Sequence, residues 1–460
     1  MYNIRILLWK MVIFMVDNIC AIATPYGVGA ISIIRASGPD AIPLVNKIFK
    51  GKDLTKVESH TIHYGHIMDN EEEVDEVLSL VYKAPKSFDG ENMVEISCHG
   101  GIYVTNQVLL TLLKNGFRMA ERGEFSKRAF LNHKMDLTQA ESIMDIISAS
   151  NKIALKSSNA SLRSQTSKLI KSFREEILDI LAKIEVNIDY PEYEDAVEVT
   201  HEYLRPIVVK LIENMDKILK NSLITTVAIH GIKTAIVGKP NVGKSSLLNM
   251  LLDEDKAIVS SYAGTTRDTV EGTLALGNVT LHLIDTAGIH ESIDYVESIG
   301  IERSKKAMEE ADLVLLVLDV SKELDDVDKL LLEETKKKNR IIIGNKIDLT
   351  PKVKLDDIIY ISAKNKEGLD LLAEKIEEVT KIDSIDQMNG NYLNNTRQMG
   401  LMEKAMNSLK QALESIDYGY DVSLIEIDIK NAFDSLGEIT GEANPDELIT
   451  ALFTKFCLGK

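Results

Sequence analysis

The strongest chemical signal in the sequence is a glycine-rich loop at residues 238–245, GKPNVGKS, which has the pattern G-x-x-x-x-G-K-S. Glycines let backbone N–H groups face phosphate oxygens, and a helix that begins here adds the positive end of its dipole. In this pattern Lys244 reaches the β- and γ-phosphates and Ser245 ligates Mg²⁺. A β-rich run at 234–237 precedes the loop and a helical run at 246–252 follows it. This context predicts a nucleoside triphosphate site and argues against a chance glycine turn.

Three further motifs follow in order and identify the base. DTAG at 285–288 supplies an acid beside Mg²⁺ and a glycine N–H near the γ-phosphate. NKID at 345–348 ends in Asp348, whose carboxylate can accept hydrogen bonds from guanine N1–H and N2–H₂. SAK at 362–364 would lie behind the guanine O6. Together the motifs predict GTP in preference to ATP.

The elements that must position these motifs alternate between β-rich and helical runs from about residue 233 to 380. The β-rich runs are 234–237, 281–284, 313–319, 340–343 and 358–361. This alternation predicts a mostly parallel, doubly wound sheet, with the four motifs at successive strand ends.

The rest of the chain has two other textures. Residues 19–130 mix short apolar runs at 30–34, 76–81 and 93–96 with glycine and proline, which predicts an α+β unit. Residues 137–188 and 399–456 are helical in pattern. One apolar stripe at helical spacing comprises Leu169, Phe173, Ile177, Ile180, Leu181 and Ile184, and Pro191 should end that helix. Helical stretches on both sides predict one helical domain with the α/β domain inserted into it.

Composition limits the class of protein. The 460 residues are 45% hydrophobic and 27% charged, as in ordinary globular proteins of two to four domains. With 53 Lys+Arg against 71 Asp+Glu, the net charge of −18 argues against binding nucleic acid by bulk charge. The cysteines, Cys20, Cys98 and Cys457, are too scattered for a metal site and favour a reducing, cytoplasmic compartment.

No apolar run is long enough to span a bilayer, so we expect a soluble protein. Residues 1–14, MYNIRILLWKMVIF, could be a truncated targeting segment or an upstream extension. Because no small-residue cleavage site follows, we favour an extension, with the folded chain beginning near Met15.

The loop AGTTRD at 263–268 resembles the translation-factor-like branch of P-loop GTPases, with Thr266 in the position that completes Mg²⁺ coordination. Ile289 and His290 follow DTAG, so the water-orienting glutamine of Ras-like enzymes is missing. Something else must activate water.

A closer resemblance covers essentially residues 17–460. It rests on the stretches at 21–37, 87–101, 123–141 and 395–398, on LGEITGE at 436–442, and on the terminal CLGK at 457–460. With these motifs the chain resembles the MnmE (TrmE) family of tRNA modification GTPases. It departs from the usual family pattern at Asp89, where threonine is common, and at His290, where arginine is common.

The resemblance implies a multidomain fold: an α+β folate-binding-like N-terminal domain, a discontinuous all-α helical domain and an inserted α/β Ras-like P-loop G domain. The expected bounds are 15–133 for the N-terminal folate-binding and dimerisation domain, 134–228 and 381–460 for the helical domain, and 229–380 for the G domain.

It also implies the roles of individual residues in GTP hydrolysis. Ser245 and Thr266 would bind Mg²⁺; Asn241, Ser260, Tyr262 and Thr265 would bind K⁺. Glu297, which taken alone could be a solvated acid at a helix start, would position water. The implied GTP-binding residues are Asn241, Val242, Gly243, Lys244, Ser245, Ser246, Ser260, Ser261, Tyr262, Ala263, Gly264, Thr265, Thr266, Asp285, Thr286, Ala287, Gly288, Asn345, Lys346, Asp348, Ser362, Ala363 and Lys364.

For the N-terminal domain the resemblance implies a tetrahydrofolate site, binding 5-formyl- or 5,10-methylene-tetrahydrofolate through Arg35, Glu95, Lys134 and Lys460. Taken alone, Arg35 or Lys134 would be a surface charge. Cys457 has two interpretations, a small buried apolar residue or an exposed reactive thiol; the resemblance favours a catalytic role in modification. For His99 we expect a structural or pocket-lining role, in preference to a metal or acid–base site.

The implied function is that of a homodimeric, K⁺-stimulated GTPase. With the flavoprotein MnmG it would add a carboxymethylaminomethyl or aminomethyl group to carbon 5 of the wobble uridine of certain tRNAs, using glycine or ammonium. Two alternatives remain. An Era/Der-type ribosome-assembly GTPase should carry a basic RNA module, yet no G-x-x-G loop among basic residues follows Ile382. A GTP-regulated scaffold would leave Cys457 and the folate residues unused.

Overall fold

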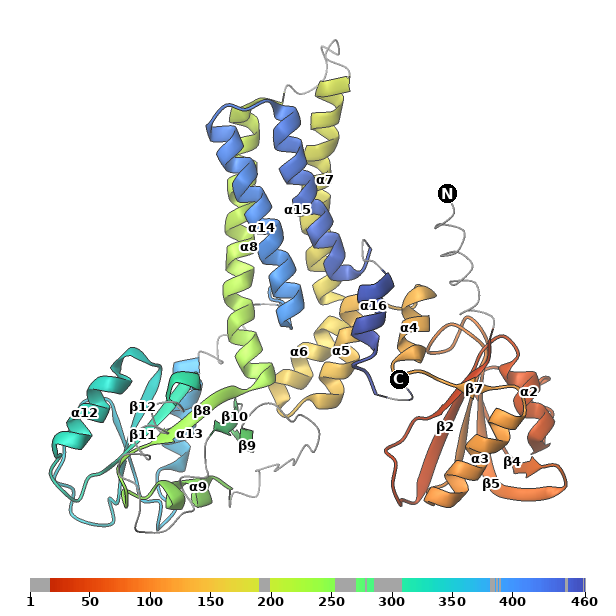
Figure 1. Cartoon of the computed structure of the whole chain (residues 1–460), viewed down its shortest axis with the longest axis horizontal. Coiled ribbons are helices and arrows are strands. Elements are labelled where there is room, and N and C mark those ends of the chain that lie inside the picture. The colour runs from red at the N-terminus through yellow and green to blue at the C-terminus, as the bar shows by residue number, and fades with distance from the viewer. Residues whose placement is uncertain are drawn as a thin grey trace. The chain divides into compact units, whose positions relative to one another are not determined.

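The computed structural model describes residues 17–189, 199–252, 270–277, 279–284, 308–380, 385, 388, 390–442, 446–457 and 459. The chain forms two compact units (Figure 1). The first comprises Met1–Met144 and Thr440–Lys460, and the second comprises Asp145–Ile439. The finer domain bounds expected from the sequence stay predictions.

The first unit contains a seven-stranded sheet of order β3-β4-β5-β6-β2-β1-β7. Its strands are β1 (Ile19–Ile22), β2 (Ile31–Ser37), β3 (Phe49–Gly51), β4 (Thr61–Asp69), β5 (Glu72–Tyr82), β6 (Met93–His99) and β7 (Arg118–Met119). Neighbouring strands are antiparallel except β1 and β7. Helices α2 (Ala41–Ile48) and α3 (Ile102–Lys114) share one buried core with the sheet, which confirms the α+β prediction.

Two helices of the first unit, and the start of a third helix, bring together segments far apart in sequence. They are α4 (Glu124–Leu131), α5 (Leu137–Ser148) and α16 (Asp446–Phe453). Leu137 and Ala140 of α5 form a buried cluster with Ile449, Phe453 and Phe456. The chain end is therefore folded against residues more than 300 positions earlier.

The helical part of the second unit comprises α6 (Lys152–Leu162), α7 (Gln165–Asp189), α8 (His201–His230), α14 (Thr396–Asp417) and α15 (Val422–Thr440). One hydrophobic core takes residues from α7, α8, α14 and α15. The predicted stripe of α7 lies in this core, and α7 ends at Asp189 as expected. Because the core joins segments on both sides of the α/β part, the prediction of a discontinuous helical domain is confirmed.

The α/β part of the second unit comprises residues 232–380. Its six-stranded sheet has the order β13-β12-β11-β8-β10-β9. The strands are β8 (Ile232–Val237), β9 (Val270–Leu276), β10 (Val279–Ile284), β11 (Leu313–Asp319), β12 (Arg340–Asn345) and β13 (Ile358–Ile361). Only the β9–β10 pair is antiparallel, so the mostly parallel sheet is confirmed. Helices α9 (Lys244–Leu252), α12 (Asp326–Glu334) and α13 (Leu369–Thr380) alternate with the strands.

The described residues contain no helix with the combined length and apolar character that crossing a membrane requires.

Candidate functional site

The glycine-rich loop connects the end of β8 to the first residue of α9, Lys244. A Cβ atom at Gly243 would lie 2.2 Å from Asn345 Nδ2, and one at Gly238 would lie 2.4 Å from Val317 O. Neither position can carry a side chain without moving its neighbours. The loop backbone therefore lies close to β11 and β12, and α9 begins at the end of this loop.

Lys244 is held inside this loop. Its Nζ donates to Gly238 O at 2.7 Å and to Lys239 O at 2.8 Å. Burial lowers the pKa of Lys244 because the charged ammonium loses water. Two neutral carbonyls replace that water only in part, so an anion in the loop would offset the cost of burying the charge.

The base motif is joined to the phosphate loop through Asn345 at the end of β12. Its Nδ2 donates to Val242 O at 2.9 Å, and its Oδ1 accepts from the backbone N–H groups of Lys346 at 2.8 Å and Ala363 at 3.0 Å. Asn345 is 2% exposed. A buried amide with three partners fixes the three loops relative to one another.

Asp348 lies at the exposed rim of the same site, and Lys364 is exposed too. The buried Ser362 hydroxyl donates to Asp348 Oδ1 at 2.8 Å. This contact orients the carboxylate while leaving it open to solvent, as recognition of a base edge requires.

Two charged contacts of this site were not expected from the sequence. Lys346 Nζ donates to Asn241 O at 2.8 Å and to Asp319 Oδ2 at 2.6 Å. Burial alone would raise the pKa of Asp319, but hydrogen bonds from Lys346 and Ser321 outweigh it, and the pKa lies below its usual value. The signal in the sequence was an acid at the end of a predicted strand.

The second unexpected contact involves Lys239, inside the phosphate loop. Its Nζ lies 2.6 Å from Asp325 Oδ2 and 2.6 Å from Asp328 Oδ2. Asp325 also caps α12 by accepting from the Val327 and Asp328 backbone N–H groups. The loop is thus tied to the start of α12.

Several predicted residues lie outside the described part of the chain. They are Ser260, Ser261, Tyr262, Ala263, Gly264, Thr265, Thr266, Asp285, Thr286, Ala287, Gly288, Glu297 and Lys460. Ser245 and Ser246 lie in the first turn of α9.

A second site forms in the first unit around Arg35 and Glu95, cross-strand neighbours on β2 and β6. Arg35 Nε and Nη2 donate to Glu95 Oε1 at 2.9 and 2.7 Å, and the side chains are 13% and 17% exposed. The guanidinium lies over the rings of Phe88 and Phe125, 5.0 and 5.4 Å from their centroids. An ion pair beside aromatic faces suits a flat, polar ring.

The C-terminal segment reaches this ion pair. Gly459 O accepts from Arg35 Nη1 at 3.3 Å. Gly459 has a φ of +88°, and a Cβ there would lie 2.5 Å from Ile22 O. Only glycine fits, so the last described residue is closely seated at the end of β1.

Cys457 is exposed, whereas Cys20 and Cys98 are buried. This confirms the interpretation of Cys457 as an exposed thiol. Burial raises the pKa of Cys20 to about 12 and also raises that of Cys98. Only Cys457 is therefore placed to react with a dissolved reagent.

Lys134 is exposed and donates through Nζ to Pro85 O at 2.9 Å, rather than to the Arg35–Glu95 pair. The unusual Asp89 is fully buried and accepts from Ser37 Oγ at 2.5 Å. His99 Nδ1 lies 2.7 Å from Asp75 Oδ1, and this carboxylate raises the pKa of His99.

Over the residues that the structure describes, no three His, Cys, Asp or Glu side chains gather as a metal site would require.

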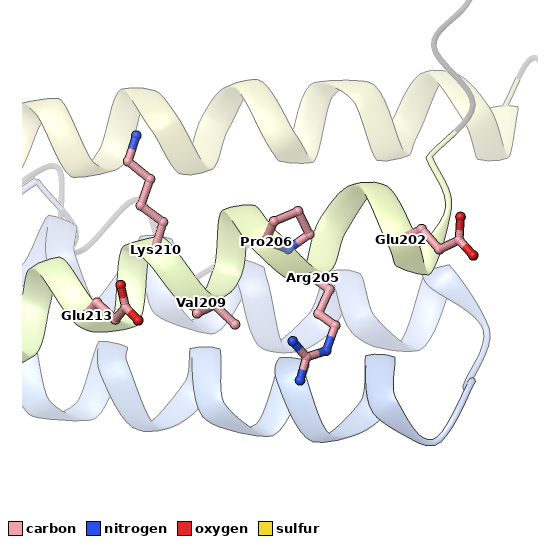
Figure 2. Close-up of a pocket in the computed structure, with 6 residues that line it drawn as sticks. All are labelled: Glu202, Arg205, Pro206, Val209, Lys210 and Glu213. Atoms are coloured by element: carbon pink, nitrogen blue, oxygen red, sulfur yellow. The ribbon is translucent and has the colours of Figure 1, made fainter.

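A surface pocket lies elsewhere, on the outside of α8 (Figure 2). It is lined by Glu202, Arg205, Pro206, Val209, Lys210 and Glu213. All six come from one helix, and none is a predicted site residue.

Comparison with known proteins covers nearly the whole chain. Residues 18–134 match the family model described as GTP-binding protein TrmE N-terminus, and residues 137–457 match the MnmE helical domain. The protein named tRNA modification GTPase MnmE from Acholeplasma laidlawii is 50% identical over 96% of this chain and 99% of its own length. Its namesake from Streptococcus gordonii is 50% identical over the same shares.

Among solved structures, an Era variant of Aquifex aeolicus is 30% identical over 32% of this chain and 56% of its own, with a TM-score of 0.25. A TM-score this low does not establish a shared fold. The matches to relatives and family models, in contrast, span both compact units and both sides of the α/β part. The chain belongs to the MnmE family of tRNA modification GTPases.

Proposed function

We propose that this chain hydrolyses GTP and, with the flavoprotein MnmG, adds a carboxymethylaminomethyl or aminomethyl group to carbon 5 of the wobble uridine of certain tRNAs. The observation that carries the proposal is the combination of two sites in one chain: the phosphate and base loops joined by Asn345, and the Arg35–Glu95 pair that receives the C-terminal segment. The relatives' name, tRNA modification GTPase, supports it.

In the nucleotide site, Asp348 accepts the guanine edge and Lys244 pairs with the β- and γ-phosphates. The residues present suit a bound phosphate group. Lys244 is partly buried, and the glycines have no side chain that would block phosphate oxygens from the backbone N–H groups. Ser245 and Thr266 would hold Mg²⁺, which neutralises phosphate charge when bound.

Asn241, Ser260, Tyr262 and Thr265 would hold K⁺, which supplies the charge that an arginine finger provides in other GTPases. Asn241 has a φ of +63°, its carbonyl oxygen accepts from Lys346 Nζ, and the residue is exposed to solvent. Glu297 would position water in place of the missing glutamine.

The hydrolysis claim is tested by GTP turnover in KCl and in NaCl. We expect faster turnover in KCl and a large loss in Glu297→Ala. Equal rates in both salts together with an unimpaired Glu297→Ala variant would overturn this part of the proposal.

The Arg35–Glu95 pair would bind a tetrahydrofolate derivative, which supplies the one-carbon unit when bound, with Lys134 and Lys460 contributing. A carboxylate can pair with an amino-pyrimidine edge, and a cation can hold a carboxylate tail. Titration of 5-formyl-tetrahydrofolate should give saturable binding that Glu95→Ala abolishes. Glu73→Ala, which removes a hydrogen bond between Glu73 Oε1 and His66 Nδ1, is the control. Absence of binding to the unaltered chain would favour the scaffold alternative.

We further propose that the chain is a homodimer. The sheet face opposite α2 and α3 presents Ile31, Ile62, Tyr64 and Leu78, which are 61%, 61%, 59% and 45% exposed. A second copy would cover this apolar face. Light scattering should report a dimer that Tyr64→Asp dissociates, whereas the exposed Tyr418→Asp control stays dimeric; a monomer at all concentrations would contradict this.

In the modification reaction we assign Cys457 a catalytic role at the exposed C-terminal segment, and we place the protein in the cytoplasm. With a net charge of −18, the chain would not grip tRNA by bulk charge, so MnmG would supply much of the basic surface. Glycine or ammonium would supply the amine.

A further inference from the structure

The second residue of the phosphate loop, Lys239, has a side chain that contacts a different element. Its Nζ donates to Asp325 Oδ2 at 2.6 Å and lies 2.6 Å from Asp328 Oδ2, and both carboxylates belong to the first turn of α12. The lysine side chain is 22% exposed. The ammonium of Lys239 is therefore bound by α12, and it does not face the space that the loop backbone encloses.

The backbone of the same residue holds the lysine that is expected to bind phosphate. The carbonyl oxygen of Lys239 accepts from Lys244 Nζ at 2.8 Å, and Gly238 O accepts from the same ammonium at 2.7 Å. The orientation of the Lys239 carbonyl thus sets one of these two contacts. Through its side chain and its carbonyl, Lys239 joins α12 to Lys244.

The two carboxylates of α12 are themselves fixed by a capping box. Asp325 accepts from the backbone N–H groups of Val327 and Asp328, both at 3.1 Å, and Asp328 Oδ2 accepts from Asp325 N–H at 3.2 Å. Hydrogen bonds, the largest contribution coming from Lys239, hold the pKa of Asp325 below its usual value. The partners of Lys239 are therefore charged at neutral pH and have defined positions.

Asp328 depends on this contact more strongly than Asp325 does. Its side chain is 5% exposed, whereas that of Asp325 is 57% exposed. Within the part of the chain that the structure describes, Asp328 Oδ1 is buried and has no hydrogen-bond partner. A buried carboxylate in this condition needs a cation beside it, and Lys239 supplies one at the other oxygen. Opening the contact would leave Asp328 both buried and unpaired, so the bridge between the loop and α12 is rigid.

We propose that Lys239 is a positioning residue for nucleotide binding: bridged to Asp325 and Asp328, it holds its carbonyl where the Lys244 ammonium is placed before the nucleotide arrives. This assigns a role to α12 that the proposed function does not contain, and it rests on that function because the loop must bind a nucleotide. A loop that is already ordered loses less freedom on binding, so the bridge should raise the affinity for GTP and GDP alike.

The test measures the Kd of a fluorescent GDP and the KM and kcat of GTP hydrolysis, for the full chain with Mg²⁺ and KCl. Lys239→Met should raise Kd and KM about 10-fold, the size of a lost hydrogen bond to a charged group. The kcat should stay within about twofold, because an interaction made equally in the ground state and the transition state changes KM alone. A purely structural defect would instead lower the active fraction, and hence the apparent kcat, with Kd and KM unchanged. Lys239→Arg keeps the charge and can pair with both carboxylates, so it should bind GDP more tightly than Lys239→Met.

A second variant and a matched control complete the experiment. Asp325→Asn should leave α12 intact, since asparagine caps helices about as well as aspartate, and it should raise Kd and KM because one charge of the bridge is lost. The control is Lys329→Met on the same helix, whose contact with Asp326 is exposed; it should leave both constants unchanged.

Three results would overturn the inference. They are an unchanged Kd in both Lys239→Met and Asp325→Asn, an equal rise in the control Lys329→Met, and no difference between Lys239→Arg and Lys239→Met. Absence of GTP hydrolysis by the unaltered chain would instead contradict the proposed function, and the GDP titration would still decide the role of Lys239.

Discussion

Lys346 Nζ lies 2.6 Å from Asp319 Oδ2, and this ion pair joins the base-recognition loop to the end of β11. The two side chains are 31% and 9% exposed. Because the same ammonium also donates to Asn241 O in the phosphate loop, three loops of the nucleotide site depend on one pair of charges.

Replacing Asp319 by asparagine should lower the free energy of unfolding at neutral pH. It should also make that free energy less sensitive to a fall in pH. The pKa of Asp319 lies below its ordinary 3.8, so its contribution is present above that pH and is lost as the pH falls through the lower folded-state pKa. At neutral pH we expect Asp319→Asn to cost about 1.5–3 kcal/mol of unfolding free energy. Below the folded-state pKa the two proteins should converge in urea unfolding; a gap that persists there would refute the assignment.

Asp348→Asn should change base preference. The amide cannot accept both guanine N–H groups, but its NH₂ can donate to the second carbonyl oxygen of xanthine. We expect GTP affinity to fall about 10- to 100-fold, from loss of hydrogen bonds to a charged acceptor, while xanthosine triphosphate binds more tightly than before. Fluorescent nucleotide titration measures both. An unchanged ratio of the two affinities would show that Asp348 does not contact the base.

Arg128 is a buried cation that pairs with three carboxylates in the first unit. Its side chain is 3% exposed and contacts Asp17 Oδ1 at 2.6 Å, Glu91 Oε2 at 2.9 Å and Glu124 Oε1 at 2.9 Å. Arg128→Met should cost about 3–5 kcal/mol of unfolding free energy, because it removes a partner from Glu91 and Glu124, whose side chains are 12% and 2% exposed.

Arg205→Met is the control for Arg128, since its pair with Asp417 is 54% and 47% exposed. It should cost less than about 1 kcal/mol. Urea denaturation of both variants checks the difference, and equal losses would mean that the buried cluster adds no more than a surface pair.

Gly459→Ala should disturb the C-terminal segment alone. The new Cβ would meet Ile22 O at 2.5 Å, in a left-handed conformation that costs about 1–3 kcal/mol. We expect binding of 5-formyl-tetrahydrofolate to weaken about 5- to 100-fold and GTP hydrolysis to be retained. Gly419 has a φ of +73° with nothing within 4 Å of its Cβ position, so Gly419→Ala carries similar backbone strain and should leave folate binding intact. If the two changes weaken folate binding equally, the close contact of Gly459 with Ile22 O does not matter for the folate site.

The three thiols should react in two classes. Ellman's reagent should modify Cys457 rapidly in the native protein and all three cysteines after denaturation, because Cys20 and Cys98 are buried with raised pKa values. Cys457→Ser should remove the rapid phase. A rapid phase that survives this change would mean that a buried thiol is accessible.

The sequence was most informative where a local pattern sets the structure. The run at 313–319 is predicted at the bounds that β11 has, because six consecutive apolar residues followed by an acid are typical of a buried strand and its end. Strand β9 was missed, since Glu271 and Gly272 interrupt its apolar pattern and its pairing with β10 supplies what the pattern lacks.

Contacts between segments far apart in the chain could not be predicted from the sequence. The motifs indicated Lys346 and Arg35, but neither Asp319 nor the Gly459 carbonyl could be assigned as a partner, because the pairing depends on strand order and on where the chain end lies. The net charge was a poor guide to the partner. A value of −18 argues against binding RNA by bulk charge, yet the relatives are named for tRNA modification.

The central claim is tested most directly by mass spectrometry of wobble nucleosides in tRNA from a strain that lacks this gene. We expect the aminomethyl-type modification at carbon 5 of the wobble uridine to disappear, to return with the unaltered gene, and to stay absent with Lys244→Ala or Cys457→Ser. A wobble profile unchanged by the deletion would contradict the account.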